Sequence, residues 1–158
     1  MKLRAAKPGW SAKADVVVIG SGVAGLTTAL QIRAHNLSVL LVTKARVDSG
    51  STKWAQGGIA AALGPGDSPA EHEADTLKAG AGLCDRNAVH ALVTEGPEAV
   101  ARLIARGAVF DRAASGEIAL TREGGHLKNR ILHAGGDATG AEISRALLAA
   151  VTDDPGIE

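Results

Sequence analysis

The sequence predicts an α/β fold with a parallel sheet, and three neighbouring segments indicate it. Residues 15–19 (DVVVI) and 38–43 (SVLLVT) are apolar runs rich in branched side chains, as in strands buried on both faces of a parallel sheet. Residues 23–36 lie between them with apolar side chains at helical spacing, and Asn36 is placed to end a helix. Strand, helix and strand in about 30 residues form a βαβ unit with a right-handed crossover.

The later segments predict helices around shorter strands. A turn-forming loop precedes a helix at residues 70–80. Residues 86–111 predict two helices, the second opened by Pro97, because proline is favoured at the first position of a helix. Residues 117–140 are strand-like with two glycine pairs, and an amphipathic helix is expected at residues 141–152.

Composition excludes several classes of function. Lys plus Arg equals Asp plus Glu at 17 each, so no charge footprint for nucleic acid or an acidic membrane is expected. No apolar run reaches the roughly 18 residues of a membrane span. Cys84 is the single cysteine, which excludes a disulfide within the chain, favours a cytoplasmic location and, with scattered histidines, gives no zinc-ligand spacing.

Residues 20–25 (GSGVAG) have the GxGxxG spacing, directly after a predicted strand and at the start of a predicted helix. In that setting the glycines permit a tight turn, and the N–H groups of the helix N-terminus face a pyrophosphate. The segment therefore predicts a dinucleotide site, with a glycine-rich packing turn as the alternative.

The end of the second predicted strand narrows the choice of dinucleotide. An NAD site places Asp or Glu about 20 residues after the glycine loop, to hold the ribose hydroxyls. Here Thr43, Lys44, Ala45 and Arg46 occupy that place and the acid is missing. Thr43 and Lys44 can donate to the adenosine half, which leaves NADP open, and the alternative for Lys44 is a solvated strand end.

A second glycine-containing loop spans residues 51–58 (STKWAQGG). Ser51, Thr52 and Gln56 are uncharged hydrogen-bonding groups, and Gly57 with Gly58 lets backbone amides approach a flat ligand. This chemistry suits the pyrophosphate and ring edge of a flavin. A flexible surface loop is the alternative, although the apolar residues that follow fit it poorly.

Five segments together carry a resemblance to a known family: VVVIGSGVAGLTTAL, STKWAQGGIAA, EADTLKAGAGLCD, EGPEAVARLIARGAVFD and LTREGGHLKNRILHAGGDATG. In this order they resemble the N-terminal flavin domain of the L-aspartate oxidases, within the fumarate reductase and succinate dehydrogenase flavoprotein superfamily. The resemblance implies a Rossmann-like FAD-binding domain. Residues 1–13 are then expected to be a flexible N-terminal tail. Residues 14–158 are expected to be the N-terminal portion of the domain, truncated before the sheet is complete and lacking the capping and C-terminal helical domains.

The same resemblance implies the residues that contact FAD. Lys44 takes the place of the usual acid, and relatives that bind FAD covalently place a histidine where Ser51 stands, so non-covalent FAD is expected. The implied FAD-binding residues are Gly20, Ser21, Gly22, Val23, Ala24, Gly25, Lys44, Ser51, Thr52, Lys53, Trp54, Ala55, Gln56, Gly57 and Gly58.

Residues 121–126 (TREGGH) distinguish relatives within this superfamily. Taken alone they predict a charged hairpin turn. The dicarboxylate reductases and dehydrogenases carry an apolar aromatic residue where Glu123 stands, and a carboxylate there gives a substrate ammonium a partner. Leu127 departs from the family's serine. His126 and His133 are expected either near the substrate cleft or as structural histidines.

Three other histidines, His35, His72 and His90, are expected at the surface.

The resemblance also implies that the parent protein oxidises L-aspartate to iminoaspartate, with hydride passing from the substrate Cα to flavin N5 and then to oxygen or fumarate. The product feeds quinolinate formation in NAD biosynthesis, with coupling to quinolinate synthase as a possible partnership. The family's catalytic arginine is outside this chain, so the 158 residues alone are expected to be inactive. A succinate or fumarate flavoprotein and a non-catalytic nucleotide-binding module are the alternatives.

Overall fold

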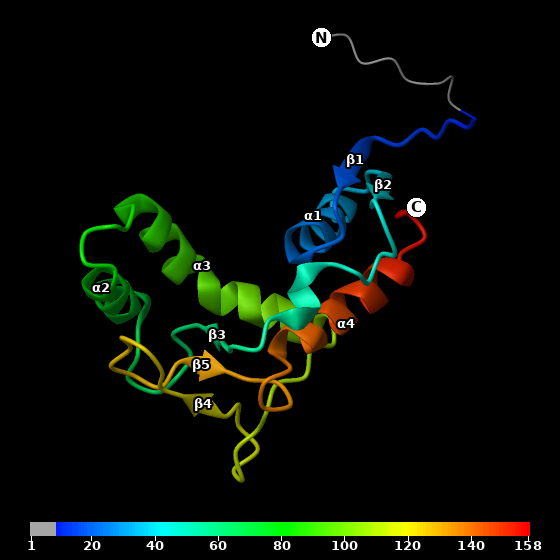
Figure 1. Cartoon of the computed structure of the whole chain (residues 1–158). Helices are drawn as coiled ribbons and strands as arrows, with labels where there is room; N and C mark the ends of the chain where they lie inside the picture. The colour runs from blue at the N-terminus through cyan, green and yellow to red at the C-terminus, as the bar shows by residue number, and fades with distance from the viewer. Residues whose placement is uncertain (1–8) are drawn as a thin grey trace.

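The computed structural model describes residues 9–158, in which two small sheets are joined by helices (Figure 1). Of the tail predicted at residues 1–13, residues 1–8 lie outside the described residues, and residues 9–13 form no helix or strand. In chain order the elements are β1 (Val16–Ile19), α1 (Val23–Arg33), β2 (Val39–Val42), the 3₁₀ helix η1 (Ser51–Trp54), β3 (Ile59–Ala60), α2 (Pro69–Ala79), α3 (Arg86–Ala105), β4 (Leu120–Thr121), β5 (Ile131–Leu132) and α4 (Thr139–Thr152).

The predicted βαβ unit is confirmed. β1 and β2 pair in parallel, from Val16 opposite Val39 to Ile19 opposite Val42. α1 connects them and ends before Asn36, whose φ of +59° breaks the helical conformation. Asparagine tolerates this left-handed region better than most residues, which explains its place at the stop.

The prediction that the first strand is buried on both faces is wrong for the described residues. Val18 is buried with Ala29 of α1 and Val39, whereas Val17 and Ile19 are 54% and 84% exposed. Successive side chains of a strand point to opposite faces. α1 covers the face that carries Val18, and the other face is open in the described part of the chain.

The parallel sheet gains a third member that the sequence did not predict. The backbone of residues 156–158 runs parallel to β2, with Ile157 bridged to Val39. The Val39 N–H donates to Gly156 O at 2.9 Å, and the Leu41 N–H donates to Glu158 O at 2.8 Å. Three residues are too few to show the alternation of apolar and polar side chains that identifies a strand in a sequence. Only the backbone hydrogen bonds of this segment reveal that it belongs to the sheet. β2 is therefore central in this sheet.

The second sheet is antiparallel, with the order β3-β5-β4. It confirms the strand-like character of residues 117–140, although only four of those residues are in β4 and β5. Leu132 pairs with Ile59 on one side and Leu120 on the other. Leu132 is fully buried and belongs to the main apolar core. The buried residues of this core are Leu26, Ala61, Val100, Leu103, Ala108, Phe110, Leu132, Ala134, Ile143, Ala146, Leu147 and Val151.

α3 corrects the prediction of two helices, because it runs unbroken from Arg86 to Ala105 with Pro97 inside it. Proline removes one backbone hydrogen bond and costs about 3 kcal/mol in a helix interior. Val93, Val100 and Leu103 are buried along one side of α3, so a break at Pro97 would divide a single packed face. Burial of that continuous face outweighs the lost bond.

α4 links the two sheets. Its first turn packs against η1 and its length lies along α1, and Figure 1 shows it ending near β2. Ile143, Ala146, Leu147 and Val151 are buried on its inner side, as the amphipathic pattern predicts. None of the helices in residues 9–158 combines the length and apolar character needed to cross a bilayer.

Candidate functional site

The glycine loop forms a tight turn between β1 and α1. Gly20 has a φ of +109°, a conformation that glycine adopts without strain, and its N–H donates to Val42 O at 2.8 Å. Gly22 caps α1 without any side-chain hydrogen bond, and the first bond of the helix runs from the Leu26 N–H to Gly22 O. Within residues 9–158, the N–H groups of Ala24 and Gly25 donate to no protein acceptor. The start of α1 thus offers unused donors to an anion.

Gly25 is required for the close approach of α1 to this turn. A Cβ added at Gly25 would lie 1.8 Å from Gly20 O, whereas a Cβ at Gly22 would meet only Thr52 Oγ1, at 3.5 Å. The third glycine of the motif therefore serves helix–strand packing, and the first permits the turn, as the motif predicts.

A cleft of about 310 Å³ opens where the two parallel strands end. One wall is the glycine loop, with Gly20, Ser21 and Gly22, and the opposite wall includes Thr43 and Lys44. Ser21 Oγ donates to Thr43 Oγ1 at 3.3 Å, which ties the two walls together. The structure thus brings Lys44 to the cleft beside the glycine loop, at the end of the second strand, where an NAD site would present an acid.

The segment after the cleft is folded around Thr52, which favours the ligand-binding interpretation over that of a flexible loop. Residues 51–54 form η1, and Thr52 Oγ1 accepts a hydrogen bond of 3.1 Å from the N–H of Val23. η1 also packs against the start of α4, where a Cβ on Gly140 would lie 2.0 Å from Thr52 O. One hydroxyl therefore joins η1 to the glycine loop.

Some of residues 53–58 are exposed to solvent, and others pack against neighbouring elements. Trp54 and Gln56 are exposed, and Lys53 Nζ lies 5.0 Å from the centre of the Trp54 ring. A Cβ on Gly57 would meet nothing within 4 Å, whereas one on Gly58 would lie 2.2 Å from Ile131 Cγ2. Gly58 thus has a packing role against β5 that the sequence did not indicate. Ala55, between the two groups, is exposed and accepts a hydrogen bond from the Gly140 N–H at 2.9 Å.

Glu123 is hydrogen-bonded to His133. Glu123 Oε1 lies 2.9 Å from His133 Nε2, and Thr121 Oγ1 lies 3.1 Å from the same nitrogen. The Glu123 side chain is 55% exposed and that of His133 is 18% exposed. A carboxylate held at one end and open at the other can accept a cationic ligand.

A buried ionic cluster that the sequence analysis did not predict lies beside this segment. The Arg130 side chain is fully buried. It donates to both carboxylate oxygens of Asp67, at 2.9 and 2.7 Å, and to Asp75 Oδ2 at 2.8 Å. His126 Nδ1 lies 3.2 Å from Arg130 Nη1, which supports the structural alternative for that histidine. Asp67 and Asp75 lie 63 and 55 positions from Arg130 along the chain, so no local motif relates the carboxylates to the arginine.

The charges of this cluster shift each other's pKa values. The backbone N–H of Leu127 and the Arg130 guanidinium hold the pKa of Asp75 below its ordinary value. Burial would raise the pKa of Asp67, but the hydrogen bonds and charge of Arg130 hold it below the ordinary value as well. Because Leu127 uses its backbone N–H, its departure from the family's serine leaves this bond intact.

The prediction of a surface position for His72 is wrong. The residue is 3% exposed on α2, with its ring centre 5.2 Å from that of His126, and its Nδ1 has no hydrogen-bond partner within residues 9–158. Burial and the nearby Arg130 charge lower its pKa. Both histidine rings line a cavity of about 640 Å³ between α2, α3 and β3. His35 and His90 are exposed, as expected.

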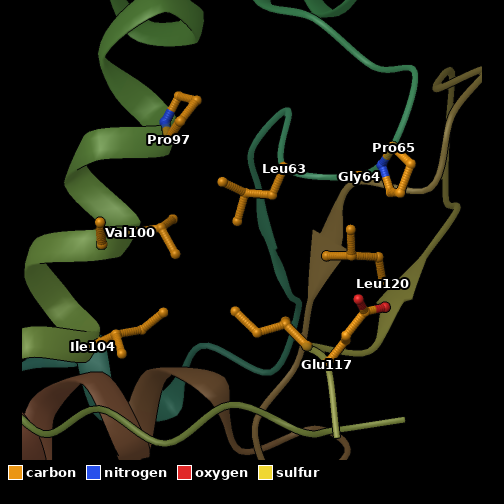
Figure 2. Close-up of a pocket in the computed structure, with 10 residues that line it drawn as sticks. Leu63, Gly64, Pro65, Pro97, Val100, Ile104, Glu117 and Leu120 are labelled. Atoms are coloured by element: carbon orange, nitrogen blue, oxygen red, sulfur yellow. The ribbon is translucent and has the colours of Figure 1, made fainter. Parts of the chain in front are cut away.

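A further cavity, of about 430 Å³, separates α3 from the segment that leads into β4 (Figure 2). Leu63 and Val100 project toward each other across it, and Ile104 and Leu120 complete its apolar wall (Figure 2). Glu117 is its one charged lining residue. This wall lacks the convergent polar groups of a catalytic site.

Comparison with known proteins identifies the family of this chain. The family of FAD-binding domains matches residues 15–158. L-Aspartate oxidase of Streptomyces coelicolor is 66% identical over 151 residues, which cover 96% of this chain and 26% of that protein. The chloroplastic L-aspartate oxidase of Oryza sativa is 52% identical, over 90% of this chain and 22% of that protein. The chain thus spans about a quarter of the length of the curated relatives it matches.

Solved structures give the same fold. The Sdh1 complex of Mycobacterium smegmatis with UQ1 superposes with a TM-score of 0.82 at 38% identity, over 87% of this chain and 23% of that one. E. coli quinol fumarate reductase superposes with a TM-score of 0.84 at 29% identity, over 92% of this chain and 25% of that one. A dinucleotide fits three features of this site. The N–H groups at the start of α1 are free, Gly25 lets α1 approach the turn closely, and a cleft opens beside Lys44. The chain therefore belongs to the family of FAD-binding domains, and its cofactor is FAD.

Proposed function

We propose that the protein containing this chain oxidises L-aspartate to iminoaspartate with FAD. The observation that supports this best is Glu123, an exposed carboxylate whose partner His133 lies against the loop that carries the flavin residues. The relatives named above as L-aspartate oxidases match this region within nearly the whole chain. Succinate and fumarate carry no ammonium for such a carboxylate to bind, whereas an amino acid does.

Each part of this chain has a role in the proposal. FAD, when bound, supplies the two-electron acceptor. Gly20 to Gly25 and Lys44 hold its phosphates and adenosine half, and Ser51 to Gly58 line its ring. The Glu123 carboxylate binds the ammonium of L-aspartate and so orients the Cα that reacts.

Replacing Glu123 with glutamine should raise KM for L-aspartate roughly tenfold to a hundredfold, because one charge-assisted contact to the ammonium is lost. The KM for succinate or fumarate should change by less than about threefold, because neither carries an ammonium. Steady-state kinetics of the flavin-loaded enzyme measure both. Equal loss for all three substrates would contradict the role of Glu123.

We also propose that the FAD is held without a covalent bond. Serine at position 51 cannot form the histidyl linkage, and Ser51 is the first residue of η1 beside the glycine loop. Acid precipitation of the loaded protein should therefore leave all the flavin in the supernatant, as absorbance at the flavin band would show. Flavin that stays with the precipitated peptide would contradict this.

A second candidate is a succinate or fumarate flavoprotein, which the fold of the two solved relatives favours. Glu123 argues against it, since neither succinate nor fumarate carries an ammonium for its carboxylate to bind. Aspartate-dependent bleaching of the flavin, without bleaching by succinate, distinguishes the two. A protein that binds FAD and is bleached by neither would be a non-catalytic module.

The cellular setting is part of the same proposal. Oxygen or fumarate would reoxidise the flavin, and the iminoaspartate would pass to quinolinate synthase in NAD biosynthesis. The single cysteine supports a cytoplasmic location. We propose that residues 14–158 form the N-terminal portion of the FAD-binding domain, and that these residues alone do not turn over L-aspartate because the catalytic arginine is outside them.

A further inference from the structure

His133 is held so that both nitrogens of its ring face oxygen atoms. Nδ1 lies 3.1 Å from the carbonyl oxygen of Gly136, and Nε2 lies 2.9 Å from Glu123 Oε1. The ring therefore bridges the backbone turn at Gly136 and the Glu123 carboxylate, with one nitrogen against each oxygen.

The turn that anchors this ring is itself fixed by Asp111. Its carboxylate accepts hydrogen bonds from the N–H groups of Gly135, at 2.9 Å, and Gly136, at 3.2 Å. Both glycines have positive φ values, of 57° and 76°, which suit glycine at this bend. Asp111 also donates its own N–H to His133 O at 2.8 Å. Asp111 therefore determines where the ring of His133 lies.

The ring also lies against the second glycine loop. A Cβ on Gly58 would be 3.0 Å from His133 Cε1, so no side chain separates the histidine from this loop. Through His133, Glu123 is placed at a fixed distance from residues that line the flavin ring in the proposed function. The geometry of the amine site is therefore linked to that of the flavin site.

Only one oxygen of Glu123 takes part in this arrangement. Oε1 is engaged by His133 and, at 3.4 Å, by Thr121 Oγ1, while Oε2 has no partner within residues 9–158. We propose that His133 is a positioning residue that holds Oε1 so that Oε2 points to a substrate ammonium. This inference rests on the proposed oxidation of L-aspartate and adds a specificity-determining residue to it.

The test is a double-substitution cycle in the flavin-loaded enzyme. His133→Phe keeps a planar ring but removes both ring nitrogens, and should raise KM for L-aspartate about tenfold while changing kcat less. KM for succinate should stay within about twofold, because an amine-free substrate makes no use of Glu123. The variant carrying both His133→Phe and Glu123→Gln should bind L-aspartate no worse than Glu123→Gln alone, because His133 acts through Glu123.

Two further variants serve as controls. His133→Gln retains an amide N–H donor and should recover part of the lost affinity for L-aspartate. His90→Phe removes another histidine that pairs with a carboxylate, His90 with Glu73 at 2.9 Å, and should leave both KM values unchanged. A purely structural role of His133 would instead raise KM for both substrates and give additive effects in the cycle, which would overturn the proposal.

An NMR measurement, which needs no catalysis, also tests whether His133 is hydrogen-bonded to Glu123. In the proton NMR spectrum of this protein, the hydrogen-bonded Nε2–H of His133 should give a downfield signal that Glu123→Ala removes and His90→Phe leaves in place. A signal that survives Glu123→Ala would overturn the proposal. An enzyme that does not oxidise L-aspartate would overturn both this inference and the proposed function, whereas activity with an unchanged KM in His133→Phe overturns this inference alone.

Discussion

Replacing Arg130 with methionine should lower the free energy of unfolding by about 3–5 kcal/mol, because it leaves two buried carboxylates without their cation. The Arg130 side chain is fully buried and bonds Asp67 through two nitrogens and Asp75 through the third. Methionine fills much of the volume, so the loss reports the uncompensated charges rather than a cavity. Urea unfolding at neutral pH, followed by circular dichroism, measures the change.

The matched control is Arg46→Met at the surface. Arg46 pairs with Asp48 at 3.1 Å, but its side chain is 85% exposed. Exposed pairs contribute about 0–1 kcal/mol, so this substitution should cost less than about 1 kcal/mol. Adding Asp67→Asn and Asp75→Asn to Arg130→Met should restore part of the stability, since it removes the unpaired charges. Equal losses in the two single variants would contradict the importance of the buried cluster.

Replacing Gly25 with alanine should lower the free energy of unfolding by about 3 kcal/mol and weaken FAD binding at least about tenfold. The new Cβ would lie 1.8 Å from Gly20 O and 2.9 Å from Gly20 C. Both are backbone atoms of the turn, so they yield only if α1 moves away from the loop. That movement displaces the free N–H groups at the start of α1, which hold the FAD phosphates in the proposed function.

Gly57→Ala provides the comparison, because a Cβ there meets nothing within 4 Å. Its free energy of unfolding should change by less than about 0.5 kcal/mol. Titration of FAD fluorescence against each variant gives the affinity, and thermal unfolding of the flavin-free protein gives the stability. Wild-type stability and affinity in the Gly25 variant would show that α1 and the glycine loop are not in the close contact described.

Local patterns predicted the parts of the fold that local forces determine. The alternation of apolar runs and glycines identified β1, α1 and β2, because strand, turn and helix preferences act over a few neighbouring residues. Ser68 and Pro69 also explain where α2 begins, since Ser68 Oγ accepts the Glu71 N–H at 3.2 Å. The glycine loop could be assigned to a dinucleotide because its spacing and its position agreed.

The parts that sequence reasoning missed depend on distant contacts. Arg130 is buried because Asp67 and Asp75 come to it from positions 63 and 55 residues away. His72 is buried with its ring 5.2 Å from that of His126, although its helix looks polar in sequence. Pro97 by itself predicts the start of a helix. It lies inside α3 because the buried face of this helix is continuous across it. Glu123 was identified by resemblance, but its contact with His133 required the structure.

α4 ties the stability of the two sheets together. One sheet has only short parallel segments and the other only two-residue strands, and sheets of this size are marginal by themselves. Because the same helix packs on η1 at its start and on α1 along its length, neither half keeps its core once α4 detaches. Residues 9–158 are thus expected to unfold together. A substitution that destabilises β5 should therefore also reduce the hydrogen-exchange protection of amide protons in β1.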